Sequence, residues 1–68
     1  MSEYRTKLIY QIKRMFDKYI SWKEYFEDDP VVSLTFGRVN GLVDALCMLD
    51  GKYYNIYDCL ALYEELTK

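Results

Sequence analysis

Few side chains in this sequence are suited to acid–base or nucleophilic chemistry. The sequence contains no histidine, which removes the commonest general base and a frequent metal ligand. Its two thiols, Cys47 and Cys59, have no carboxylates at the spacing that would complete a tetrahedral zinc site. Asp44 beside Asn40 is the only polar pair near apolar residues, and a carboxylate on a solvated helix surface explains it. We therefore expect no enzymatic activity, no metal site and no cofactor.

Tyrosine is the unusual component of the composition, with eight among 68 residues. Tyr4, Tyr19 and Tyr63 fall on apolar stripes, so we expect them in the core. An exposed tyrosine offers a large contact area at a small cost in entropy, and clusters of such rings mark protein-binding surfaces. The alternative is that these rings cover the rim of a small core. The candidate protein-binding residues are Tyr10, Tyr25, Tyr53, Tyr54 and Tyr57.

Small residues recur at every fourth position from 37 to 45. On a helix this spacing forms a shallow groove that another backbone can approach closely. A glycine inside a helix costs about 1 kcal/mol relative to alanine, so two of them need a compensating contact. That contact lies either within the monomer or with a second copy of the chain, and the sequence leaves both open. The candidate self-association face consists of Leu34, Gly37, Gly41, Ala45 and Met48.

A basic edge runs along the first segment. Lys7, Arg14 and Lys18 share this edge with Gln11 and Tyr25, a pattern that can follow a phosphate backbone. A solvated helix face explains the same pattern. Residues 1–26 carry six Lys and Arg against three Asp and Glu, whereas residues 27–68 carry three against eight, and the net charge is −2. Nucleic-acid binding through Lys7, Arg14 and Lys18 is therefore the alternative function.

The apolar spacing predicts three helices in one domain that spans residues 1–68. The first runs from Ser2 to about Phe26, with apolar residues at helical intervals. The second has Asp29 as N-cap and Pro30 at its first position, and ends at Gly51. A third begins near residue 55, where Asn and Asp stand three positions apart as in a capping box, and runs to the C-terminus.

Residues 31–36 also have the composition of a β-strand, which is the main rival interpretation. Periodicity favours a helix, because apolar residues continue the 3.6-residue period through both glycines. These residues are Val32, Phe36, Val39, Val43 and Leu46. The predicted fold is an all-α, three-helix bundle with a long N-terminal helix. So short a chain has a thin margin of stability, which self-association would widen.

The N-terminal residues are polar, so we expect no signal peptide and two reduced thiols in a cytoplasmic protein. Charged residues interrupt every long apolar run, so we also expect no membrane-spanning segment.

The stretch from Trp22 to Leu49 resembles short open reading frames of bacteriophages and mobile elements. The resemblance lies in Asp29-Pro30 and in the segment from Phe36-Gly37-Arg38-Val39 through Gly41-Leu42-Val43-Asp44-Ala45-Leu46, and it covers less than half of the chain. It implies a class of small proteins that bind and redirect a host or phage protein, including inhibitors of bacterial defence systems. Together these observations predict a non-enzymatic protein-binding module that acts as a homodimer.

Overall fold

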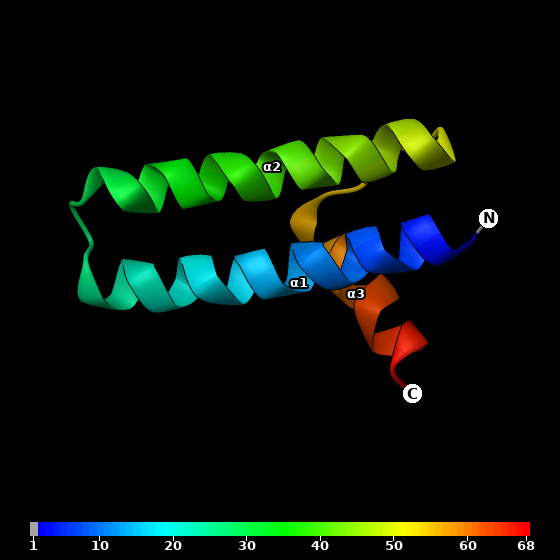
Figure 1. Cartoon of the computed structure of the whole chain (residues 1–68), viewed down its shortest axis with the longest axis horizontal. Coiled ribbons are helices and arrows are strands. Elements are labelled where there is room, and N and C mark those ends of the chain that lie inside the picture. Colours follow the sequence, from blue (N-terminus) through cyan, green and yellow to red (C-terminus); the bar gives the residue numbers. More distant parts are fainter. Residues whose placement is uncertain (1) are drawn as a thin grey trace.

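The computed structural model describes residues 2–68 as three α-helices that pack against one another (Figure 1). α1 comprises Ser2–Tyr25, α2 comprises Pro30–Asp50 and α3 comprises Ile56–Leu66. No strand occurs in residues 2–68, and residues 31–36 form the first turns of α2. The predicted all-α bundle is therefore confirmed, and the strand interpretation of residues 31–36 is wrong.

The helix ends lie where the capping residues predict them. The Asp29 carboxylate accepts a hydrogen bond from the backbone N–H of Val31 at 2.9 Å, and Pro30 occupies the first position of α2. Gly51 ends α2 in the left-handed conformation, with φ of 66°, which glycine adopts without a steric penalty. Asn55 and Asp58 form a reciprocal capping box at the start of α3.

α1 and α2 form an antiparallel hairpin, and α3 covers only part of it (Figure 1). α3 packs mainly on the N-terminal half of α1 and makes few contacts with α2. Three helices therefore meet at one end of the hairpin, whereas the end near the turn at residues 26–29 consists of two helices alone.

The core lies where the three helices meet. Val32 and Thr35, in the first turns of α2, are buried as well. The Thr35 hydroxyl donates to the carbonyl of Val31 at 2.8 Å, so its burial leaves no unsatisfied donor. The core cluster consists of Leu8, Ile9, Ile12, Val39, Val43, Leu46 and Cys59.

Two residues predicted in the core are exposed. Phe36 falls on the buried stripe of α2 by spacing, yet it lies half exposed with its ring packed against Tyr19 at 5.0 Å between centroids. The reason is that α3 does not reach this end of the hairpin. Tyr4 is exposed because it lies at the margin of the wide apolar stripe of α1, in the first helical turns.

A polar network joins the far end of α2 to the start of α1. Arg5 donates from Nε to Asp50 at 3.0 Å and forms an ion pair with it at 2.9 Å, and the Tyr54 hydroxyl donates to the same carboxylate at 2.7 Å. These hydrogen bonds, from Arg5 first and from Tyr54 second, lower the pKa of Asp50 below its usual value. The network fixes the α2–α3 connection against α1.

Candidate functional site

The predicted self-association residues form one surface, which we call the outer face of α2: Leu34, Gly37, Gly41, Ala45 and Met48. This face lies opposite the buried stripe of α2. Leu34 is 68% exposed and Met48 is 84% exposed, whereas Ala45 at the margin is half-buried against the core. A Cβ atom added at Gly37 or Gly41 would meet no described atom within 4 Å. The glycines therefore serve no close packing within the monomer, and that alternative is wrong.

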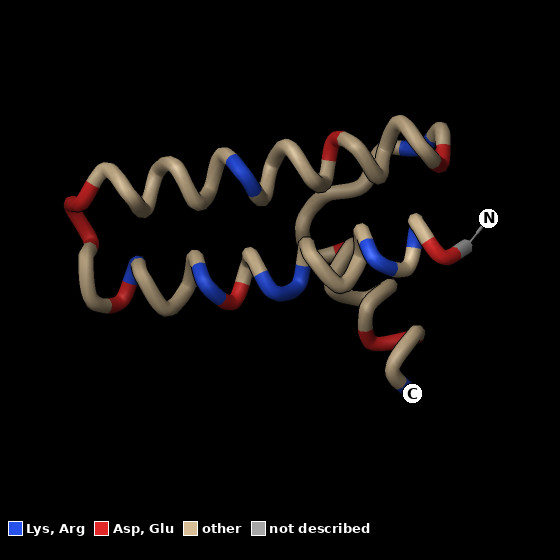
Figure 2. The backbone as a smooth tube through the Cα atoms, viewed as in Figure 1, with Lys and Arg blue, Asp and Glu red and all other residues tan. Residues whose placement is uncertain are grey.

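The outer face lacks cover because α3 packs on α1 instead of α2. α2 is also poor in charge, with Arg38 and Asp44 as its only charged residues before Asp50 at its end (Figure 2). The sequence predicts no membrane-spanning segment, yet by length and composition alone α2 qualifies as a membrane-crossing helix, and only 28% of its most apolar 18-residue window is buried. A long apolar helix thus leaves most of its surface outside the bundle, and this surface is the first candidate for a binding site.

The candidate tyrosines do not form a single surface. Tyr25 is the last residue of α1 and lies by the hairpin turn, while Tyr53 and Tyr57 lie on and after the α2–α3 connection, all three largely exposed. Tyr10 packs edge-to-face on Tyr63 of α3, with 5.4 Å between ring centroids, and so contributes to helix packing.

The expectation that Tyr54 is exposed is wrong. The ring is half-buried against the core, its hydroxyl donates to Asp50, and its backbone N–H donates to Cys47 Sγ at 3.2 Å. Its bond to Asp50 raises the pKa of Tyr54, because the carboxylate needs the phenolic proton. Tyr54 therefore stabilises the fold through its core contacts and its hydrogen bonds. Residue spacing did not predict this, because the hydrogen bond of its hydroxyl to Asp50 depends on how the α2–α3 connection folds.

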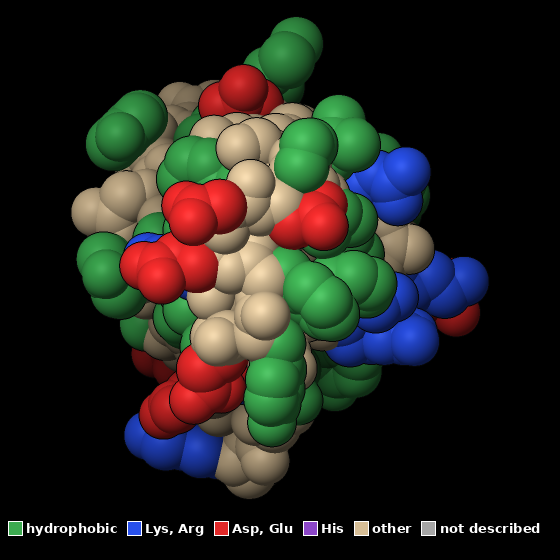
Figure 3. All heavy atoms as spheres, turned by 90° about the vertical axis from the view of Figure 1, so that its left-hand side faces the viewer, with side chains coloured by type: hydrophobic (Ala, Val, Ile, Leu, Met, Phe, Trp, Pro, Cys, Tyr) green, Lys and Arg blue, Asp and Glu red, His purple; other side chains and the backbone are tan. Residues whose placement is uncertain are grey.

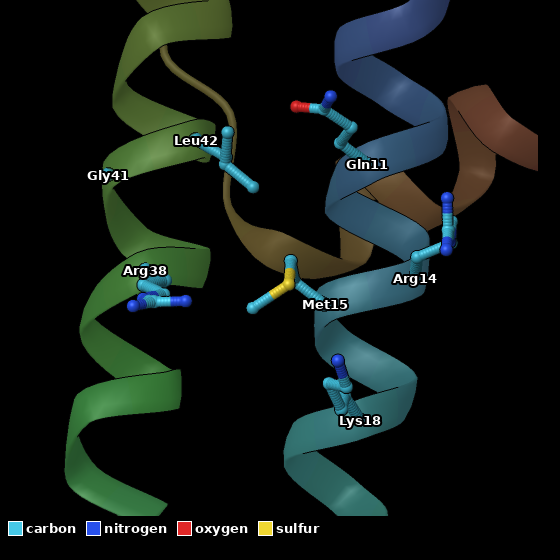
Figure 4. Close-up of a pocket in the computed structure, with 7 residues that line it drawn as sticks. All are labelled: Gln11, Arg14, Met15, Lys18, Arg38, Gly41 and Leu42. Carbon is cyan, nitrogen blue, oxygen red and sulfur yellow. The ribbon is translucent and has the colours of Figure 1, made fainter. Parts of the chain in front are cut away.

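A second candidate site is a hollow of about 520 Å³ between α1 and α2 (Figure 4). Arg14 and Lys18 of the predicted basic edge line it, whereas Lys7 lies exposed on the same helix outside it. Arg38, the only basic residue of α2, lines the hollow from that helix (Figure 4). The predicted basic edge runs along one helix alone and therefore does not include Arg38. The complete lining is Gln11, Arg14, Met15, Lys18, Arg38, Gly41 and Leu42.

The three cations of the hollow form no ion pair with any residue from 2 to 68. The nearest acidic residue on the same helix, Asp17, is held by Lys13 at 2.7 Å. The lining contains no carboxylate, so its polar groups are two guanidinium groups, one ammonium and one amide. The hollow is therefore a concave surface rich in hydrogen-bond donors and positive charge.

The two thiols differ in their surroundings, and no group of metal-ligating side chains was found in the described part of the chain. Burial raises the pKa of Cys59 to about 11, because the thiolate would lose its hydration. Cys47 is half-buried beside the backbone of Tyr54.

We expect Cys47 to react with a thiol reagent such as dithionitrobenzoate in the native protein, and Cys59 to react only when the protein unfolds. The reason is that the thiolate is the nucleophile and Cys59 rarely forms it. Stopped-flow labelling of the Cys47→Ser and Cys59→Ser proteins measures each thiol alone. Equal native rates for the two thiols would contradict the burial of Cys59.

Comparison with protein-family models, curated proteins and solved structures finds no match. Two surfaces of this chain are candidates for its function: the uncovered outer face of α2 and the basic hollow beside it. Each surface is suited to binding.

Proposed function

We propose that this protein is a non-enzymatic, protein-binding module that forms a homodimer through the outer face of α2. The observation that carries the proposal is the combination of two exposed apolar side chains, Leu34 and Met48, with two helical glycines at which an added Cβ atom would meet no described atom within 4 Å. Glycine in a helix interior lowers stability, by about 1 kcal/mol each, unless a close contact offsets the loss. A facing helix supplies such a contact.

The pattern of the outer face favours a second copy of the chain as the facing partner. Large apolar residues, Leu34 and Met48, lie seven positions on either side of Gly41, and the small residues Gly37 and Ala45 lie four positions on either side. An antiparallel pair of α2 helices centred on Gly41 places each large residue level with a large one, and each small residue level with a small one. A surface complementary to itself is what a twofold interface requires.

The charges beside this face agree with the same register. Arg38 and Asp44 lie three positions on either side of Gly41 and have opposite signs, so the antiparallel pair brings no like charges level with one another. The same two residues disfavour a membrane as the cover for α2. They occupy the middle of the helix, where a charge costs about 2.5–3.5 kcal/mol in a bilayer.

A dimer leaves other exposed aromatic residues available for a different protein. None of these exposed tyrosines belongs to α2. Tyr25 lies at the hairpin turn, and Tyr53 and Tyr57 lie near the α2–α3 connection. The resemblance to phage and mobile-element proteins implies a host or phage protein as the target. We propose that these tyrosines contact it, with each copy in the dimer presenting one set.

We expect the wild-type protein to have the mass of a dimer and the Gly41→Leu protein to have the mass of a monomer. The leucine side chain separates the two backbones by several ångströms, yet its Cβ atom meets nothing within 4 Å in the monomer and leucine favours the helix more than glycine does. Sedimentation equilibrium over a range of protein concentrations measures both masses.

The matched control is Asn40→Leu, which adds the same side chain at an exposed position of α2 outside the outer face. This protein should remain a dimer. A wild-type protein that stays monomeric at all concentrations, or a Gly41→Leu protein that dimerises as well as the control, would overturn the proposed dimer.

A further inference from the structure

We infer that the hollow between α1 and α2 binds a small phosphate ester with an apolar or aromatic body. This site borders the proposed dimer interface at Gly41 and Arg38 of α2, whereas its other two cations, Arg14 and Lys18, belong to α1. It also combines residues from two helices that the sequence pattern alone did not bring together. Figure 3 shows basic side chains gathered mainly along its right-hand side, while acidic side chains lie mostly over the upper and left-hand parts, among hydrophobic ones.

The donors of the hollow match a phosphate group better than a carboxylate. Arg14 and Arg38 each present a planar fork of N–H groups, and Lys18 adds an ammonium group. A phosphate offers three acceptor oxygens and up to two negative charges, whereas a carboxylate offers two oxygens and one charge. Because Arg14 and Lys18 have no acidic partner among residues 2–68, neither must give up an intramolecular ion pair before a ligand binds.

The floor of the hollow is apolar. Met15 of α1 and Leu42 of α2 point towards each other across it (Figure 4). The volume of about 520 Å³ lies within the range typical of small-molecule pockets, about 300–1,000 Å³. A ligand with an organic body therefore gains contacts that free phosphate lacks.

The charge distribution favours a small ligand over a nucleic acid. A polymer must meet a continuous basic track, because its affinity comes from many phosphate contacts. Here the residues from 27 onwards carry eight acidic groups against three basic ones, and the acidic turn at residues 27–29 lies at one end of the hairpin. Apart from Lys52 and Lys68, the basic residues lie on α1 and at the hollow.

The test is titration of the full-length protein with four probes at low salt, followed by amide chemical shifts in ¹⁵N-labelled protein. The probes are inorganic phosphate, adenosine 5′-monophosphate, adenosine and a single-stranded oligothymidylate. We expect adenosine monophosphate to bind saturably, to shift amides of the residues that line the hollow, and to bind more tightly than either phosphate or adenosine. We expect added salt to weaken this binding.

Arg14→Gln and Lys18→Gln should each weaken adenosine monophosphate binding by about fivefold to tenfold, as expected for the loss of one charged donor at a partly exposed site. Lys7→Gln, on the same helix but outside the hollow, is the control and should leave binding unchanged. Sedimentation of the same variants shows whether the dimer persists, so failure of this site and failure of the dimer are distinguishable.

Two results would overturn the inference. One is the absence of saturable shifts with adenosine monophosphate, or shifts that Arg14→Gln and Lys18→Gln leave unaltered. The other is much tighter binding of the oligothymidylate that Lys7→Gln weakens as strongly as Arg14→Gln does, which would assign the whole edge of α1 to nucleic acid.

Discussion

The Ile12→Ala protein is expected to be largely unfolded at room temperature. Ile12 is 0% exposed and belongs to the cluster in which all three helices meet. Truncation of a fully buried isoleucine costs about 2–5 kcal/mol, because the cavity that remains adds to the lost transfer free energy. The core of a domain this small rarely supplies more than about 3–5 kcal/mol, so one such loss removes most of the stability.

Urea denaturation followed by circular dichroism measures this effect, with all variants at one protein concentration because dimerisation adds to apparent stability. The matched control is Ile20→Ala, which makes the same truncation on the same helix where α3 does not reach and where the side chain is 45% exposed. We expect Ile20→Ala to lose less than half as much free energy of unfolding as Ile12→Ala. Equal losses would mean that the core does not lie at the three-helix end.

The sequence predicted the helices well because their signals are local. Asp29 with Pro30 and Asn55 with Asp58 satisfy backbone N–H groups within three residues of themselves, so the ends they define need no knowledge of the fold. The buried stripe of α2 also follows from spacing, apart from Phe36. Its exposure depends on where α3 lies, and a long-range arrangement of that kind leaves no mark on the residues near position 36.

The candidate surfaces were predictable only in part, for the same reason. The outer face of α2 follows from helical geometry, but its lack of cover depends on the packing of α3 against α1. The two explanations for the glycines are contact within the monomer and contact between copies, and both predict the same spacing of small residues. Arg38 lines the same hollow as Arg14 and Lys18 only because the hairpin brings the two helices together. No pattern within a single helix predicts that hollow.

The second large effect is a loss of folding stability at acidic pH, when Asp50 becomes protonated. In the folded protein Arg5 and Tyr54 stabilise the charged form of Asp50, so its pKa lies below the unfolded value of 3.8. The unfolded state therefore binds this proton more readily than the folded state does. The contribution is fully present above the unfolded pKa, and it is lost as the pH falls from there through the folded pKa. We expect wild-type stability to decline over this acidic window in part for this reason.

The Asp50→Asn protein tests the assignment, because it keeps the shape of the side chain but cannot ionise. At neutral pH it should lose about 1–2 kcal/mol, a figure that allows for partial exposure of the Arg5 side chain. Each 1 kcal/mol lowers the melting temperature of a domain this small by about 4–8 °C. Below the folded pKa of Asp50 the difference between the wild-type and variant melting temperatures should shrink.

The control for this experiment is Asp17→Asn, since Asp17 forms an ion pair with Lys13 within one exposed turn of α1. A surface pair of this kind contributes less than about 0.5 kcal/mol, so this variant should follow the wild-type curve. A gap between wild type and Asp50→Asn that stays constant from neutral to acidic pH would show that the aspartate acts through its shape alone. A shrinking gap ties the acid sensitivity to the charge that holds the C-terminal end of α2 against the start of α1 and fixes the connection to α3.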